Sequence, residues 1–175
     1  LEVDWKYAEA LQAADNELLV RNIVRDTFML HGLEVTFMAK PIEGVAGNGE
    51  HTHISVTAKL KNGKMINLFS PADIKKDFMS PIGWGALMGL LKNYEIVNPF
   101  VASTNDALNR LKPGFEAPVC IVASVGKAVD IPSRNRTVLV GLIRDFDNPL
   151  ATRFELRSPN PTSNTYLLLA AAYQA

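Results

Sequence analysis

The segment 44–56, GVAGNGEHTHISV, constrains the fold of this chain more than any other stretch. It begins with three glycines, Gly44, Gly47 and Gly49. Glycine can take positive φ and lets other groups approach its backbone closely, so the segment predicts a tight loop against which other parts of the chain pack.

The residues after this loop alternate and favour a β-strand. Side chains two positions apart in a strand lie on one face, so we expect His51, His53 and Ser55 to share a face while the intervening residues point to the core. Two readings remain open. The face is either the polar, solvated side of a half-buried strand or part of a metal site, because a His-x-His pair without further ligands is a weak metal signal.

The composition and charge of the chain limit the classes of protein to which it can belong. With 175 residues, 47% hydrophobic and 21% charged, the chain can bury a sizeable core. A formal net charge of zero argues against a general nucleic-acid binder. We also expect no membrane partner, since no stretch reaches the length of a transmembrane helix, and a reducing, cytoplasmic location, since a single cysteine cannot form an internal disulfide. The single cysteine, Cys120, lies in an apolar run and is expected to be a buried, inert thiol.

Periodicity predicts an α+β fold with a mixed or mostly antiparallel curved sheet and flanking helices. Strand-like runs joined by hairpin signals alternate with helical runs without a regular βαβ rhythm. An Asn62-Gly63 pair is typical of a two-residue hairpin turn. Helices are expected over 4–30, 82–92, 103–111 and from about 163 onward, and strands over 33–40, 51–61, 64–69, 119–124, 137–143 and 151–157.

Charged residues near the C-terminal end repeat the same two-residue spacing. Arg153, Glu155 and Arg157 would all point to one face of a strand, and Arg134 and Arg136 follow the same pattern. A carboxylate between two guanidiniums is either an ion-pair ladder or a metal ligand beside phosphate-binding groups. Each residue alone is most simply a solvated surface charge; their combination favours a phosphate and metal site.

Five segments in a fixed order resemble the catalytic domain of glutamine synthetases. The resemblance runs over nearly the whole chain. The matching segments are TFMAKP (36–41), GEHTH (49–53), RLKPGFEAP (110–118), SRNR (133–136) and RFELRSPNP (153–161).

This resemblance implies an ATP-dependent glutamate–ammonia ligase that forms a γ-glutamyl phosphate, from which ammonia displaces phosphate to give glutamine. It implies ATP and two divalent metals, magnesium or manganese, as cofactors. It implies glutamate and ammonia as substrates, and a ring-forming homo-oligomer as the parent protein.

The resemblance also assigns metal- and nucleotide-binding residues by position. Glu2 matches a carboxylate ligand of the metal near glutamate, while His51 and Glu155 match ligands of the metal that bridges the ATP phosphates. His53 and Ser55 fall where the family contacts the nucleotide.

Further positions match residues that act on glutamate and the transferred phosphoryl group. Gly47 matches a backbone contact to glutamate, and Arg110 the arginine near its carboxylate. Glu116 matches a flap carboxylate that shields the intermediate and binds ammonium. Arg136 and Arg157 match arginines that face the transferred phosphoryl group, Arg136 also on the nucleotide side and Arg157 also on the substrate side.

We expect residues 1–175 to be one domain and a truncated segment of such a catalytic domain, without the N-terminal domain and the C-terminal part. The segment alone is then expected to be inactive. Ala46 stands where the family often has a substrate-binding asparagine, so a related γ-glutamyl ligase using another amine is one alternative. A non-catalytic nucleotide-binding homologue is another. The role of Arg144 stays open.

Overall fold

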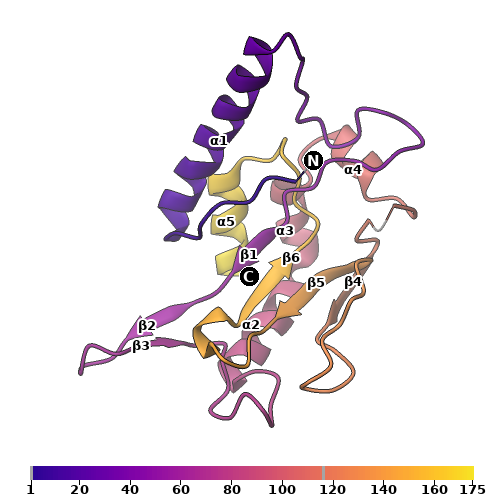
Figure 1. Cartoon of the computed structure of the whole chain (residues 1–175). Coiled ribbons are helices and arrows are strands. Elements are labelled where there is room, and N and C mark those ends of the chain that lie inside the picture. Colours follow the sequence, from indigo (N-terminus) through magenta and orange to yellow (C-terminus); the bar gives the residue numbers. More distant parts are fainter. Residues whose placement is uncertain (1, 116) are drawn as a thin grey trace.

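The computed structural model describes residues 2–115 and 117–175 and has an α+β architecture (Figure 1). Its helices are α1 (Ala10–Leu30), α2 (Pro81–Lys92), α3 (Tyr94–Val101), α4 (Asn105–Arg110) and α5 (Thr165–Gln174), with a 3-10 turn η1 (Pro149–Ala151). Its strands are β1 (Thr52–Ile54), β2 (Thr57–Lys59), β3 (Met65–Asn67), β4 (Cys120–Ser124), β5 (Val138–Ile143) and β6 (Arg153–Leu156).

The central sheet has the order β1-β6-β5-β4. β6 pairs antiparallel with β1 on one side and with β5 on the other, whereas β4 pairs parallel with β5. Strands β2 and β3 form a separate antiparallel pair that projects from the body of the molecule (Figure 1). The expected α+β fold with a mixed, mostly antiparallel sheet is therefore confirmed.

Apolar side chains from the middle strands and the helices form one core. Leu139 and Val140 of β5, Phe154 and Leu156 of β6, and Leu168 of α5 are almost completely buried. Burying one such side chain contributes roughly 1.5–3 kcal/mol, so the middle of the sheet is the most strongly fixed part of the fold. Helix α5 packs against both α1 and α3. Among the described residues, no helix combines the length and the apolarity needed to cross a bilayer.

The hairpin predicted at Asn62-Gly63 joins β2 to β3. Gly63 has a φ of 83°, which only glycine adopts without strain, and the Asn62 side chain accepts a hydrogen bond from the Lys64 backbone nitrogen. The strand expected over 51–61 is interrupted, because β1 pairs with β6 while β2 turns away to pair with β3.

The prediction of a strand over 33–40 is wrong. The segment is not assigned to a strand, and at its end the Lys40 backbone nitrogen donates to the Asp106 carboxylate instead of to a strand partner. A sequence rich in β-forming residues becomes a strand only where another strand offers backbone hydrogen-bond partners. The segment 33–40 lies beside α4, where the partner of Lys40 is the side chain of Asp106.

Two helix predictions also need correction. α1 begins at Ala10 rather than near Asp4, and its N-cap residue, Glu9, makes no side-chain capping bond. Helix α3 was not expected from the sequence, and it contains a proline, Pro99. The proline falls in the second turn of a short helix, and Tyr94, Val97 and Val101 hold the helix in place by packing into the core.

Strand β4 forms as expected but is not buried. It lies at the edge of the sheet, and Ile121 and Val122 are about half exposed. Cys120 is exposed as well, so the prediction that its thiol is buried is wrong. The side chains of a strand are buried by elements that pack on the faces of the sheet, and apolar composition alone does not reveal whether such elements are present.

A charged cluster ties α1 to the glycine loop and to α5. Arg21 contacts Glu17 on its own helix, and its Nη2 lies 3.3 Å from Oε2 of Glu50. Thr165 of α5 donates to both carboxylates, at 3.2 and 3.3 Å. Two carboxylates here share one guanidinium. Burial, followed by the negative charge of Glu17, raises the pKa of Glu50 to about 8.

This cluster predicts a pH dependence of stability. In the unfolded chain Glu50 loses its proton near its ordinary pKa, whereas in the folded chain it holds the proton up to about pH 8. The folded state therefore binds more protons, and the free energy of unfolding should fall as pH rises from about 4.5 to 8, by on the order of a few kcal/mol. Urea unfolding across this range measures the fall. Glu50→Gln should flatten it, whereas the exposed control Glu34→Gln should leave it unchanged. An equal pH dependence in the wild type and in Glu50→Gln would contradict the prediction.

Candidate active site

One large hollow collects the predicted site residues. Its volume is about 2240 Å³, well above the ~300–1,000 Å³ of a pocket for one small ligand, so it has room for a nucleotide and a second substrate. Its wall is built by the N-terminal segment, α1, the glycine loop, the segment after α4, and strands β5 and β6. The predicted site residues on this wall are Glu2, Gly47, His51, His53, Ser55, Arg110, Arg136, Glu155 and Arg157. Glu116 lies outside the described residues.

The pairing register of β1 on β6 brings the side chains of the candidate site together. His53 lies directly opposite Glu155, and Ile54 lies opposite Phe154. Side chains alternate along both strands. Because Ile54 and Phe154 point into the core, the adjacent residues His53 and Glu155 point to the other face of the sheet. The strand pairing thus puts imidazoles and charged groups from positions about 100 residues apart on one surface.

His51, Glu155 and Arg157 form a contact group on this surface. Nδ1 of His51 lies 3.2 Å from Oε1 of Glu155, and Nη1 of Arg157 donates to the same oxygen at 2.5 Å. The hydrogen bond from His51 lowers the pKa of Glu155, and the charge of Arg157 adds to this against the effect of burial. Glu155 is therefore a carboxylate at neutral pH. Arg157 is itself buried, and its Nε donates to the Arg136 carbonyl at 3.2 Å.

The side chains of His51 and Glu155 supply some, but not all, of the ligands that a hard divalent cation needs. A histidine whose Nδ1–H is held by a carboxylate presents Nε2 as a lone pair, which is the usual arrangement of metal-binding histidines. Oε2 of Glu155 makes no hydrogen bond to another described residue. His51 and Glu155 thus offer one nitrogen and one oxygen, but Nε2 lies on the side of the ring away from Glu155, so the ring or the carboxylate has to turn before both could reach the same ion. Within residues 2–115 and 117–175, no three His, Cys, Asp or Glu side chains lie close enough together to hold a metal ion, and Glu2 does not join the pair.

His53 has different partners from His51. Its Nδ1 accepts a hydrogen bond from Nε of Arg153 at 2.8 Å, and Arg153 also donates to the Ala151 carbonyl. Burial and the charge of Arg153 lower the pKa of His53, which keeps the ring neutral. Ser55 lies further along the wall, where its carbonyl accepts from the Tyr173 hydroxyl. Sequence reasoning noted the position of Arg153 but gave it no role.

The glycines of the loop are required by close packing. A Cβ on Gly47 would lie 2.2 Å from the Ala39 carbonyl oxygen. A Cβ on Gly49 would lie 2.6 Å from Nη2 of Arg110 and 3.1 Å from Nε2 of His51. Side chains at these positions would displace the loop or cover the imidazole, so glycine keeps the His51 ring open to the hollow.

Arg110 braces the backbone behind the site. Its guanidinium donates to the carbonyls of Arg157, Ser158 and Pro159 at 2.8–3.3 Å. Burial, and then the charge of Arg157, lower the pKa of Arg110 to about 10, so it remains charged at neutral pH. These three carbonyl partners were not foreseen from the sequence, because backbone acceptors leave no trace in residue identity.

Arg144 lies apart from the hollow. Its guanidinium donates to the carbonyls of Ile74, Asp77 and Val129 and lies over the rings of Phe78 and Phe146. These contacts join three loops at one end of β5. The sequence left the role of Arg144 open, and in the structure its contacts are with these loops rather than with the residues of the hollow.

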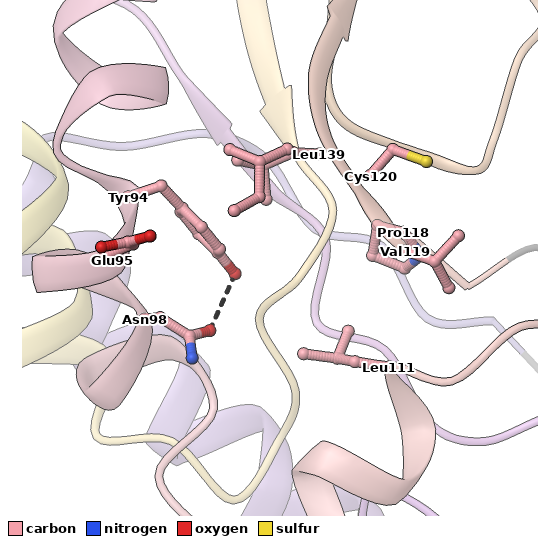
Figure 2. A pocket seen from close by; sticks show the side chains of 9 residues that line it. Tyr94, Glu95, Asn98, Leu111, Pro118, Val119, Cys120 and Leu139 are labelled. Atoms are coloured by element: carbon pink, nitrogen blue, oxygen red, sulfur yellow. Dashed lines mark hydrogen bonds between the residues drawn. The ribbon is translucent and has the colours of Figure 1, made fainter.

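A second, smaller pocket of about 200 Å³ lies between α3 and the start of β4 (Figure 2). Apolar side chains such as Leu111 and Leu139 line most of it, and Tyr94 donates to Asn98 at its wall. It contains none of the predicted site residues and has no cluster of charges, so the large hollow is the candidate active site.

Comparisons with known proteins agree with this geometry. The family model described as "Glutamine synthetase, catalytic domain" matches residues 1–175. A glutamine synthetase from Clostridium saccharobutylicum is 38% identical over 177 residues, which cover 99% of this chain and 36% of that protein. One from Thermotoga maritima is 35% identical, with coverage of 99% and 36%.

A solved structure is similar as well. The electron cryomicroscopy structure of Plasmodium falciparum glutamine synthetase matches with a TM-score of 0.77 and 28% identity, over 97% of this chain and 31% of that one. The chain thus spans about a third of the length of the relatives that it matches. From the match along its whole length, the chain belongs to the glutamine synthetase catalytic-domain family.

Proposed function

We propose that the parent protein of this chain is a glutamate–ammonia ligase, and that the large hollow is the part of its active site where ATP and glutamate meet. The observation that carries this proposal is the contact group of His51, Glu155 and Arg157 on the wall of a hollow large enough for both substrates. Membership of the family supplies the reaction: ATP phosphorylates the γ-carboxylate of glutamate, and ammonia then displaces phosphate.

In this proposal His51 and Glu155 hold a magnesium or manganese ion, and Glu2 contributes to a second one together with groups from outside this chain. When bound, such ions draw charge from the phosphoryl oxygens and orient them. The fixed charge of Arg157, buried beside Glu155, stabilises the negative charge that develops on the transferred group. Arg136 acts on the same group and on the nucleotide, while His53 and Ser55 contact the nucleotide.

Glutamate is assigned to the part of the hollow between the glycine loop and Arg110. The close packing of Gly47 on Ala39 supports this, because it leaves the loop backbone without side-chain cover. Glu116 is assigned to ammonium binding and to shielding the acyl phosphate from water. The chain itself is one domain and a segment of the catalytic domain, which fits its coverage of about a third of its relatives.

The reaction is tested by assaying the parent protein with ATP, glutamate and ammonia, and in parallel with a panel of other amines. Glutamine formed with ammonia supports the proposal. Products formed only with other amines would replace it with the related γ-glutamyl ligase.

Removing the carboxylate of Glu155 tests the metal site. Loss of an outer-shell partner typically lowers metal affinity 10–100-fold, so loss of a ligand in Glu155→Ala should weaken Mn²⁺ binding to the parent protein by roughly 100-fold or more. Activity should fall with it. Glu95→Ala, at an exposed carboxylate beside the smaller pocket, is the matched control and should bind Mn²⁺ like the wild type. Unchanged Mn²⁺ affinity and activity in Glu155→Ala would refute the ligand role.

Arg157→Lys tests the arginine beside it. Lysine keeps a positive charge but loses the planar donor set that reaches both Glu155 and the Arg136 carbonyl. We expect kcat to fall roughly 10²–10³-fold, the effect of losing one fixed donor to a developing charge. The exposed arginine of α1 provides the control Arg25→Lys, which should keep wild-type kcat. A kcat within twofold of wild type in Arg157→Lys would be inconsistent with its assigned role.

The isolated chain should form no glutamine. Among the described residues no three His, Cys, Asp or Glu side chains lie close enough together to hold a metal ion, and the ligands other than Glu2, His51 and Glu155 are assigned to other parts of the parent. A sensitive assay of the purified 175-residue chain with ATP, glutamate, ammonia and Mn²⁺ checks this. Measurable ATP-dependent glutamine formation would show that the chain holds a complete site.

A further inference from the structure

A lysine on the wall of the hollow contacts two segments that are distant in the chain. The backbone nitrogen of Lys40 donates to the Asp106 carboxylate of α4 at 2.9 Å, which anchors this residue beside the helix. Its Nζ donates to the Val45 carbonyl in the glycine loop and lies 4.5 Å from the centre of the Phe115 ring. One side chain thus joins the glycine loop to the turn that precedes Glu116.

The turn at Phe115 has a backbone conformation that needs support. Gly114 and Phe115 have φ values of 114° and 52°, and among the described residues Phe115 is the only one other than glycine with a positive φ. Such conformations persist where surrounding contacts hold them, and they concentrate at ligand clamps and switch regions. Phe115 is 59% exposed, so burial in the core does not hold it. A lysine ammonium is attracted to the face of an aromatic ring, and Lys40 supplies this contact.

The glycine loop and the segment that carries Lys40 form one unit. The backbone nitrogen of Asn48 donates to the Ala39 carbonyl at 2.8 Å, and its Nδ2 donates to the Met38 carbonyl at 2.7 Å. The turn at Phe115 is more loosely surrounded, because a Cβ on Gly114 would have no other heavy atom within 4 Å. The side chain of Lys40 therefore ties a loosely packed turn to a well-fixed loop.

We propose that Lys40 is a positioning residue that holds the turn at Phe115 against the glycine loop while the acyl phosphate reacts. The inference deepens the proposed function and rests on it, since that function assigns glutamate to the glycine loop. When the tie is lost, water enters beside the acyl phosphate. The oxygen of water then adds to the acyl carbon, the bond from this carbon to the phosphate oxygen breaks, and glutamate, inorganic phosphate and a proton are released.

Hydrogen–deuterium exchange of the parent protein tests the tie without any activity. In Lys40→Met, a peptide spanning residues 111–118 should exchange roughly two- to fivefold faster than in the wild type, the size expected for losing one exposed cation–π contact. Lys40→Arg keeps a cation over the ring and should exchange like the wild type. Lys61→Met, at an exposed lysine of the β2–β3 hairpin, is the matched control. Wild-type exchange of this peptide in Lys40→Met would overturn the proposal.

The phosphate released per glutamine formed by the parent enzyme is the functional readout. Lys40→Met and Phe115→Leu should each raise this ratio roughly twofold or more, whereas Lys40→Arg and Lys61→Met should keep the wild-type ratio. Because both residues belong to one contact, the double variant should raise the ratio no further than one single variant does.

The alternative role of Lys40 is a direct contact with an anionic substrate. In that case Lys40→Met would raise KM for glutamate or ATP without changing the ratio of phosphate to glutamine, and its effect would add to that of Phe115→Leu. Either result would overturn the proposal. A parent without ligase activity would count against the proposed function, whereas the exchange measurement would still decide whether Lys40 holds the turn.

Discussion

The antiparallel pairing of β1 with β6 is the constraint on which the candidate site depends. It sets His53 opposite Glu155 and puts the buried residues Ile54 and Phe154 on the other side. A slip of one residue would exchange the two faces, which would bury the charged groups and expose the core. The cost of such an exchange is what makes the register unique. The same hydrophobic burial that stabilises the sheet therefore also positions the chemistry.

A second constraint fixes the loops at the ends of these strands. Arg110 holds the carbonyls of residues 157–159, and the Glu50 backbone nitrogen donates to the Pro159 carbonyl at 2.9 Å. Gly49 packs against the Arg110 guanidinium with no room for a side chain. The glycine loop, α4 and the segment after β6 thus meet around one buried arginine. This arrangement explains why the segments that match the family are far apart in the chain yet close in the fold.

Sequence patterns predicted those features that depend on local chemistry or on strict alternation. The Asn62-Gly63 hairpin, most helices and the shared face of the histidines belong to this group. The failures have a common physical cause. The segment 33–40 has β-rich composition but no strand partner, β4 has apolar composition but only one neighbour, and Cys120 is exposed with it. Helix α3 forms around Pro99 because its apolar side chains pack into the core. Each of these outcomes depends on neighbours that are distant in the chain.

The sequence by itself determined the family, the α+β class and the residue types that meet in the hollow, because ordered motifs and two-residue spacings record which face of a strand each side chain takes. Only the tertiary structure decided which partners each of those side chains has. It gave His51 a carboxylate partner and His53 a guanidinium partner, turned Arg110 toward backbone carbonyls, and separated Arg144 from the site. The physical reason is that hydrogen-bond direction, proton position and charge depend on atoms that strand pairing and packing bring within about 3 Å, from positions that the sequence leaves far apart.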